Sequence, residues 1–205
     1  MCNIIYSTSD AFAALKTDGS VITWGFNGGD SSSVSSELSS GVTSIYATER
    51  AFAAIKSDGS VITWGYHLYG GDSSSVSSFL NYDVDEIYSN YGAFAALKGD
   101  RVITWGSSDY GGDSSSVSSE LNYGVTSIYA TMSAFAALKS NGSVVTWGNT
   151  YGGDSSSVSS ELSSDVIEIF SNIYAFAALK SDGSVVTWGN QNAVSYTHLT
   201  LPTKA

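Results

Sequence analysis

The five tryptophans of this 205-residue sequence recur at almost constant spacing, and each precedes a glycine. Successive tryptophans lie 40, 41, 42 and 41 residues apart, at Trp24, Trp64, Trp105, Trp147 and Trp188. An Ala-Phe-Ala-Ala element recurs in the same phase, and Gly-Gly-Asp-Ser-Ser-Ser-Val-Ser-Ser follows four of the tryptophans. The chain is therefore a tandem repeat of about 41 residues, and such units bury their apolar surface against their neighbours.

Each unit has the pattern of a β-hairpin and one further strand. In the second unit, residues 51–56 form a short apolar run, residues 57–60 supply turn chemistry with Asp-Gly, and residues 61–64 are β-branched and aromatic. Residues 42–48 alternate apolar and polar side chains, which is typical of a strand. The third unit is one residue shorter at residues 98–101, so we expect a tighter turn there.

Alternation along the strands separates two kinds of side chain. Ile62 and Trp64 are expected on one face of the hairpin, and Val61 and Thr63 on the other. The alanines of the facing strand are small, so they leave room for an indole ring or a neighbouring sheet.

A serine-rich segment joins the hairpin to the next strand. Val34 and Leu38 are four residues apart, which aligns them on one helical face, and Asp30 is well placed to cap that segment. The same spacing recurs at Val76 and Leu80, Val117 and Leu121, and Val158 and Leu162. We expect about two helical turns or an irregular edge segment. An all-β fold follows, of three or possibly four strands per unit, either as propeller blades or as coils of a β-solenoid.

The sequence resembles one known repeat family. Residues 18–25, Asp-Gly-Ser-Val-Ile-Thr-Trp-Gly, preceded by Ala-Phe-Ala-Ala-Leu-Lys, resemble the core of the repeat in the regulator of chromosome condensation family. Tyr-Gly-Gly-Asp, at residues 69–72, 110–113 and 151–154, stands where that family usually has a Gly-Gln-Leu-Gly turn. The resemblance covers residues 4 to about 190 and implies a β-propeller, usually of seven four-stranded blades. We therefore expect a partial propeller of about four and a half repeats.

Two departures limit what the resemblance implies about function. The unit is some ten residues shorter than the usual blade, and the Gly-Gln-Leu-Gly turn is replaced throughout. The founding member's activity is nucleotide exchange on a small nuclear GTPase, with chromatin attachment. We do not expect that activity here, because the sequence has no insertion resembling the family's wedge and no basic tail, and because propellers host many unrelated functions.

The repeat is expected to fill residues 1–192, with a non-native tail at residues 193–205. The stretch from Val194 to Thr203 breaks the repeat and resembles one reading frame of a sequencing adapter. The chain also opens inside a unit, since residues 4–8 align with residues 44–48. An open arc of this kind exposes edges that invite pairing, so we expect the isolated chain to be only marginally stable as a monomer.

Composition restricts the classes of partner. The net charge of −11 disfavours binding to nucleic acid or anionic membranes. No apolar run reaches the roughly 18 residues of a membrane span. The single cysteine, Cys2, excludes an intrachain disulfide and a cysteine-based metal site.

No catalytic residues and no cofactor are predicted. His67 is the only histidine in the repeat region, and a lone histidine in a loop is usually a surface residue, so we expect no serine–histidine–aspartate site. A ring of repeated aspartates could offer oxygen ligands to calcium, but each is expected to cap the serine-rich segment that follows it. These aspartates are Asp30, Asp72, Asp113 and Asp154. The Asp-Gly aspartates, with Asn141 in the fourth unit, are expected to form turns, and the lysines beside them to be solvated.

Partner-binding residues are predicted where the repeat consensus breaks, at or beside the ends of strands. They are Glu49, Arg50, Tyr66, His67, Leu68, Asn90, Tyr91, Met132, Asn172, Ile173 and Tyr174. We expect a non-enzymatic module that binds protein or acts as a scaffold. The alternative is a repetitive extracellular or cell-surface structural or adhesion protein, suggested by the abundance of serine and the low content of charged residues.

Overall fold

The repeats fold into three-stranded antiparallel sheets that follow one another along the chain. The computed structural model describes residues 4–194, and within them it forms five such sheets, each with its strands in sequence order. The strands are β1 (Ile4–Ser7), β2 (Ala11–Leu15), β3 (Val21–Gly25), β4 (Val42–Ala47), β5 (Ala51–Lys56), β6 (Val61–Gly65), β7 (Glu86–Ser89), β8 (Ala93–Lys98), β9 (Arg101–Gly106), β10 (Val125–Ala130), β11 (Ala134–Lys139), β12 (Val144–Gly148), β13 (Val166–Ser171), β14 (Ala175–Lys180) and β15 (Val185–Gly189).

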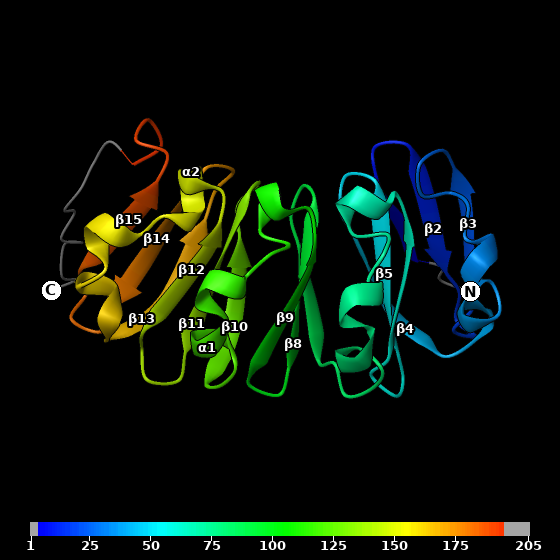
Figure 1. Ribbon diagram of the computed structural model, residues 1–205, viewed down its shortest axis with the longest axis horizontal. Coiled ribbons are helices and arrows are strands. Elements are labelled where there is room, and N and C mark those ends of the chain that lie inside the picture. The colour runs from blue at the N-terminus through cyan, green and yellow to red at the C-terminus, as the bar shows by residue number, and fades with distance from the viewer. Residues whose placement is uncertain (1–3, 195–205) are drawn as a thin grey trace, which may run out of the picture.

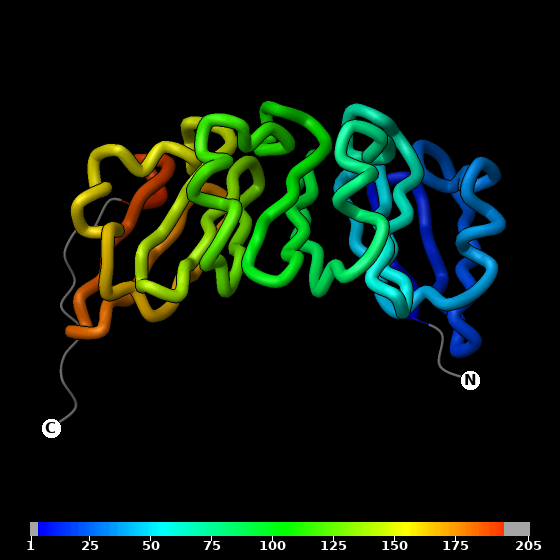
Figure 2. Tube along the Cα trace, turned by 60° about the horizontal axis from the view of Figure 1, so that its bottom comes forward, coloured from blue at the N-terminus to red at the C-terminus, as the bar shows by residue number. Residues whose placement is uncertain are grey.

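The sheets stand side by side as blades along an arc (Figures 1 and 2). The first strand of each sheet contacts the first strand of the next, from β1 to β4, β7, β10 and β13. Strands pair only within a unit, which is the arrangement of propeller blades. The β-solenoid alternative is wrong, because successive coils of a solenoid would pair their strands with one another. The predicted tail lies outside the described residues except for Ala193 and Val194.

The serine-rich segments form short helices, mostly of the tight 3₁₀ type. They are η1 (Ser32–Val34), η2 (Glu37–Ser39), η4 (Ser74–Phe79), η6 (Ser115–Val117), α1 (Ser118–Leu121), η7 (Ser156–Val158) and η8 (Glu161–Ser163). The predicted capping is confirmed: the Ser32 N–H donates to Asp30 Oδ1 at 2.9 Å, and the other three aspartates repeat the bond. These helices occupy the place of a fourth strand, so each blade has three strands where the resemblance implies four.

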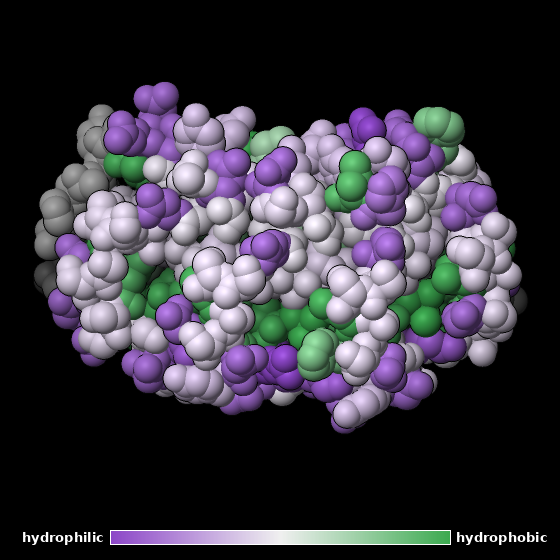
Figure 3. All heavy atoms as spheres, viewed as in Figure 1, coloured by the Kyte–Doolittle hydropathy of each residue, from purple (hydrophilic) through white to green (hydrophobic). Residues whose placement is uncertain are grey.

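The core lies between the blades, where an aromatic face meets an alanine face. Phe94 and Trp105 stack with ring centroids 5.1 Å apart and pack against Ala51 and Ala53 of the preceding sheet. Phe52, Phe135 and Phe176 repeat this contact and are likewise at most 1% exposed. Figure 3 shows hydrophobic residues in the recesses between the helical segments, surrounded by polar ones.

The turns confirm the role predicted for the Asp-Gly residues. The Ser60 N–H donates to Asp58 Oδ1 at 2.9 Å, and Asn141 accepts the same bond from Ser143 at 3.0 Å. In the third unit Lys98 pairs directly with Arg101, so the predicted tighter turn is also confirmed.

The prediction that the lysines beside these turns are solvated is wrong for Lys139, which is only 8% exposed. Four of the five lysines reach back to a backbone carbonyl in or just after the preceding helical segment, with Nζ···O distances of 2.6–3.2 Å. Carbonyls near the end of a helix lack partners within the helix, so a nearby ammonium group satisfies them. The four lysines are Lys56, Lys98, Lys139 and Lys180.

Replacing Lys139 with methionine is expected to lower the free energy of unfolding by about 1.5–3 kcal/mol. Methionine keeps the apolar stem, but the Glu120 carbonyl loses a charged donor that lies 2.7 Å away. Urea unfolding followed by circular dichroism measures the loss. The matched control is Lys16→Met in the first unit, where the ammonium lies 3.8 Å from the exposed carboxylate of Asp18. The control should change stability by less than about 0.5 kcal/mol, and equal losses in both variants would contradict the assignment.

Candidate functional site on the inner loops

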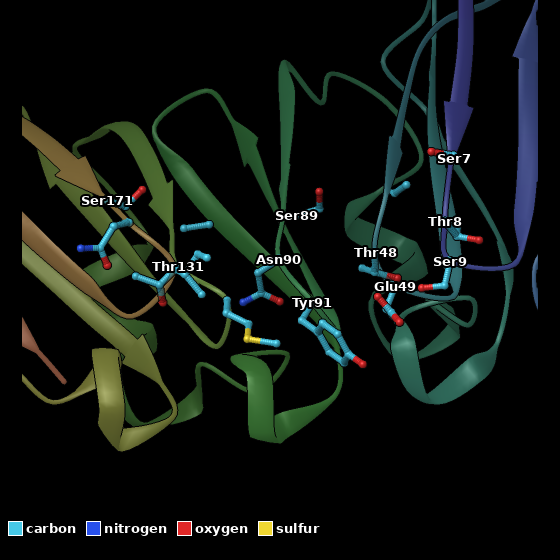
Figure 4. Close-up of a pocket in the computed structure, with 15 residues that line it drawn as sticks. Ser7, Thr8, Ser9, Thr48, Glu49, Ser89, Asn90, Tyr91, Thr131 and Ser171 are labelled. Atoms are coloured by element: carbon cyan, nitrogen blue, oxygen red, sulfur yellow. The ribbon is translucent and has the colours of Figure 1, made fainter. Parts of the chain in front are cut away.

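The loops that join the first and second strands of the five sheets line one groove. Its volume is about 700 Å³, and every sheet contributes three consecutive residues (Figure 4). Because the first strands of successive sheets contact one another, their loops are also neighbours. Residues about 40 positions apart in the sequence therefore lie side by side on one surface.

A line of backbone hydrogen bonds joins these loops. The Ser9 N–H donates to the Glu49 carbonyl at 3.0 Å, and Glu49 donates to Tyr91 at 2.9 Å. Tyr91 donates to Met132 at 3.2 Å, and Met132 donates to Ile173 at 2.9 Å. We call these five equivalent positions the loop ladder. The ladder fixes the backbone, so the side chains at these positions can differ without changing the fold.

The ladder positions are the point where the repeat is least regular. Their residues are serine, glutamate, tyrosine, methionine and isoleucine, although the flanking strands are nearly identical. The next position also differs in every unit, with aspartate, arginine, glycine, serine and tyrosine. Met132 is 39% exposed and Ile173 is 61% exposed, so apolar side chains face solvent here.

The residue before each ladder position holds the loop. Thr48 Oγ1 accepts the Ala51 N–H at 3.1 Å, and Asn90 Oδ1 accepts the Ala93 N–H at 2.9 Å. Asn172 Oδ1 accepts the Ala175 N–H at 2.8 Å. The two predicted binding residues Asn90 and Asn172 therefore line the groove, but their side-chain oxygens serve the loops.

Tyrosine rings gather around the middle of the ladder. The centroids of Tyr91 and Tyr110 are 5.2 Å apart, and Tyr69 lies 5.8 Å from Tyr91 and 6.3 Å from Tyr110. Tyr66 contacts Tyr69 at 5.7 Å, and the Arg50 guanidinium lies 5.6 Å from the Tyr69 centroid. We call Tyr69, Tyr91 and Tyr110 the tyrosine cluster. It is supplied by the third-unit loop and by the helices η3 (His67–Tyr69) and η5 (Ser108–Tyr110).

Two members of the tyrosine cluster, Tyr91 and Tyr110, stay protonated at neutral pH. Desolvation raises the pKa of Tyr91, and the Glu49 carboxylate and the neighbouring phenols raise it further. Desolvation also raises the pKa of Tyr110, with Tyr69 and Asp109 adding to the shift. The phenol groups of Tyr91 and Tyr110 therefore keep their protons and can donate hydrogen bonds.

Comparison with known proteins identifies the fold. The sequence matches no family model and no curated protein. Among solved structures, yeast RCC1 (Prp20) bound to Kap60 shares 14% identity, with 91% of this chain and 55% of that chain covered and a TM-score of 0.53. The CR4 receptor kinase ectodomain of Physcomitrella patens shares 16% identity, with 91% and 49% covered and a TM-score of 0.52. Human WBSCR16 shares 18% identity, with 91% and 62% covered and a TM-score of 0.51.

The fold is that of a β-propeller. The chain spans about half to just under two thirds of the length of these structures. The fold expected from the resemblance to the chromosome condensation regulators is confirmed, because RCC1 is among the structures with this fold. Membership of that repeat family stays a prediction.

The structure brings most of the predicted binding residues together. Glu49, Asn90, Tyr91, Met132, Asn172 and Ile173 line the groove. Arg50, Tyr66 and His67 lie around the tyrosine cluster. Leu68 on η3 is 53% exposed, and Tyr174 is 53% exposed one residue beyond the ladder.

Sequence reasoning missed Tyr69 and Tyr110 because it sought residues that break the repeat. Both belong to Tyr-Gly-Gly-Asp, which is repeated three times. The signal that could have found them is the aromatic residue at the ladder position of the third unit alone, where Tyr91 contacts both.

Within residues 4–194, no group of three or more histidine, cysteine, aspartate or glutamate side chains is arranged to hold a metal ion. In the same part of the chain, no helix has the length and apolar character needed to cross a membrane.

Proposed function

We propose that this chain is a non-enzymatic protein-binding module that holds an extended segment of its partner along the loop ladder. The single observation that carries the proposal is the contrast between the near-identical strands and the five different ladder residues. A repeat kept uniform for folding has no structural need for serine, glutamate, tyrosine, methionine and isoleucine at one equivalent, backbone-anchored position. Varied side chains on a rigid scaffold are typical of a binding surface.

The chemistry of the groove favours a basic segment with an apolar portion. Glu49 and the tyrosine cluster lie at one part of the ladder, and tyrosine faces attract lysine and arginine side chains. Met132 and Ile173 continue the surface with exposed apolar groups. The net charge of −11 would also attract a basic partner over a longer range.

Proteins of the same fold support a role in protein binding. Yeast RCC1 (Prp20) was solved bound to Kap60, and Prp20p from Saccharomyces cerevisiae has binding properties toward Gsp1p and histones. These partners are not carried over, because the chain resembles those proteins in fold alone. The alternative, a structural or adhesion protein, makes no use of the five different ladder residues.

The test is selection of binding peptides of about 12 residues, which reach about 40 Å when extended, from a displayed random library against the whole chain. We expect the selected peptides to be basic and to lose affinity about tenfold or more with Tyr91→Ala, as for a central aromatic anchor. Glu49→Gln should weaken the basic peptides and reduce the salt dependence of binding. Isothermal titration calorimetry measures both effects.

The matched control is Tyr151→Ala. Tyr151 occupies the same place in Tyr-Gly-Gly-Asp as Tyr69 and Tyr110, but it is 63% exposed and lies outside the groove. Its replacement should leave affinity unchanged. Peptides that bind equally well to the Tyr91→Ala and wild-type chains would refute the proposed site.

A further inference from the structure

The first sheet leaves uncovered an aromatic face that is buried in every other unit. Phe12 and Trp24 stack with centroids 5.4 Å apart, like their counterparts, but each is 43% exposed. The equivalent Phe52 and Trp64 of the second unit are 0% and 2% exposed. Two neighbouring apolar side chains on the same face, Ile5 and Ile22, are also exposed.

The last sheet leaves part of the opposite, alanine face uncovered, with Ala193 and Val194 beside it. Ala177 is partly exposed, whereas the equivalent Ala53, Ala95 and Ala136 are fully buried under the aromatic pair of the following unit. Phe170, beside this face on β13, is 54% exposed. The two terminal sheets therefore present the two halves of an interface that occurs four times inside the chain.

The loop ladder ends in the same complementary way. Each ladder N–H donates to the carbonyl of the following unit, so the ladder terminates with the Ile173 N–H at one end and the Ser9 carbonyl at the other. A first sheet placed after the last sheet would bring these two groups together as donor and acceptor. The terminal hydrogen-bonding groups of the ladder and the apolar faces of the end sheets are therefore both complementary to a second copy of the chain.

We propose that the 205-residue chain associates head to tail, with the aromatic face of the first sheet of one copy on the alanine face of the last sheet of another. The second copy is the occupant because its face is the same structure that fills this position inside the chain. The interface is heterologous, so each added copy presents a free face to the next. It lacks the buried leucine that a serine-rich helix adds to each internal interface, such as Leu38 or Leu121. The association should therefore be weaker than the packing between internal blades.

The experiment is sedimentation velocity of the full chain from about 1 to about 100 µM, a range that brackets micromolar affinity. Wild type is expected to form species larger than a monomer as concentration rises. Trp24→Glu should keep the aromatic face from docking, and Ala177→Glu should block the alanine face, so each variant alone should remain monomeric. Both positions are at least partly exposed, and circular dichroism confirms that the variants fold.

The decisive sample is an equimolar mixture of the two variants. Trp24→Glu keeps a working alanine face and Ala177→Glu keeps a working aromatic face, so the mixture should form a dimer and nothing larger. The control Tyr123→Glu changes an exposed residue away from both ends and should assemble like wild type. A wild-type monomer at about 100 µM, loss of assembly in only one of the two variants, or a mixture that stays monomeric would each overturn the proposal.

Discussion

Replacing Phe94 with alanine should lower the free energy of unfolding by about 3–5 kcal/mol, the usual cost of removing a fully buried phenylalanine. The Phe94 ring is 0% exposed, and it stacks on Trp105 while contacting the alanine face of the preceding sheet. Its removal leaves a cavity between two blades, and the sheets cannot close that cavity without losing their backbone register. Urea unfolding measured by circular dichroism gives the difference directly.

The chain supplies its own control for this prediction. Phe12→Ala removes the same side chain from the same position of the repeat, but Phe12 is 43% exposed and has no preceding sheet among residues 4–194. Its loss should cost about 1 kcal/mol or less, in proportion to the smaller apolar area that it buries. Both variants are measured at a protein concentration low enough to prevent association between copies through the first and last sheets. Equal losses would mean that the stacking of phenylalanine on tryptophan, rather than packing between blades, supplies the stability.

The sequence was sufficient to predict this architecture because the same few residues mark every unit. The recurring Trp-Gly and Ala-Phe-Ala-Ala elements fixed the length of the unit and the position of the hairpin. The small alanines were expected to leave room for an indole ring or a neighbouring sheet, and the structure shows the second, with Phe94 packed against Ala53 of the preceding sheet. These features are local or periodic, so a single sequence reveals them.

Features that depend on contacts between units were harder to predict. Lys139 was expected in water, but its ammonium group reaches the Glu120 carbonyl, 19 residues earlier. The loop ladder joins positions such as Glu49 and Tyr91, and no local pattern shows that their backbones are hydrogen-bonded. The spacing of Val34 and Leu38 predicted a helical segment but could not distinguish the 3₁₀ type from the α type.

The sequence predicted only part of the candidate site. Breaks in the repeat identified Glu49, Tyr91, Met132 and Ile173, and the structure places these residues in one groove. The same criterion could not select Tyr69 and Tyr110, since repeated residues can also become functional when a neighbour changes. A search for divergence therefore finds the residues that differ between units, while the structure adds the uniform residues that surround them.

Replacing Gly59 with alanine is the second change with a large expected effect, because it strains the backbone and also separates two units. Gly59 has φ of +74°, which costs a residue with a Cβ about 1–2 kcal/mol. An added Cβ would collide with the backbone N of Asp83 and lie 2.7 Å from its Cα, where the next unit begins. The Gly59 carbonyl also accepts the Val84 N–H at 3.0 Å, so the two segments cannot move apart without losing this bond.

Gly183→Ala separates these two contributions. Gly183 occupies the same turn in the last unit with φ of +86°, and a Cβ there would meet nothing within 4 Å. Its replacement should cost about 1–2 kcal/mol from the backbone alone, whereas Gly59→Ala should cost about 3 kcal/mol or more. Thermal and urea unfolding at low protein concentration measure both losses. If the two variants are equally destabilised, the loss comes from backbone strain within the turn, and the contact with the next unit adds nothing to stability. A larger loss for Gly59 would show that the Asp-Gly turn also sets the spacing between neighbouring blades.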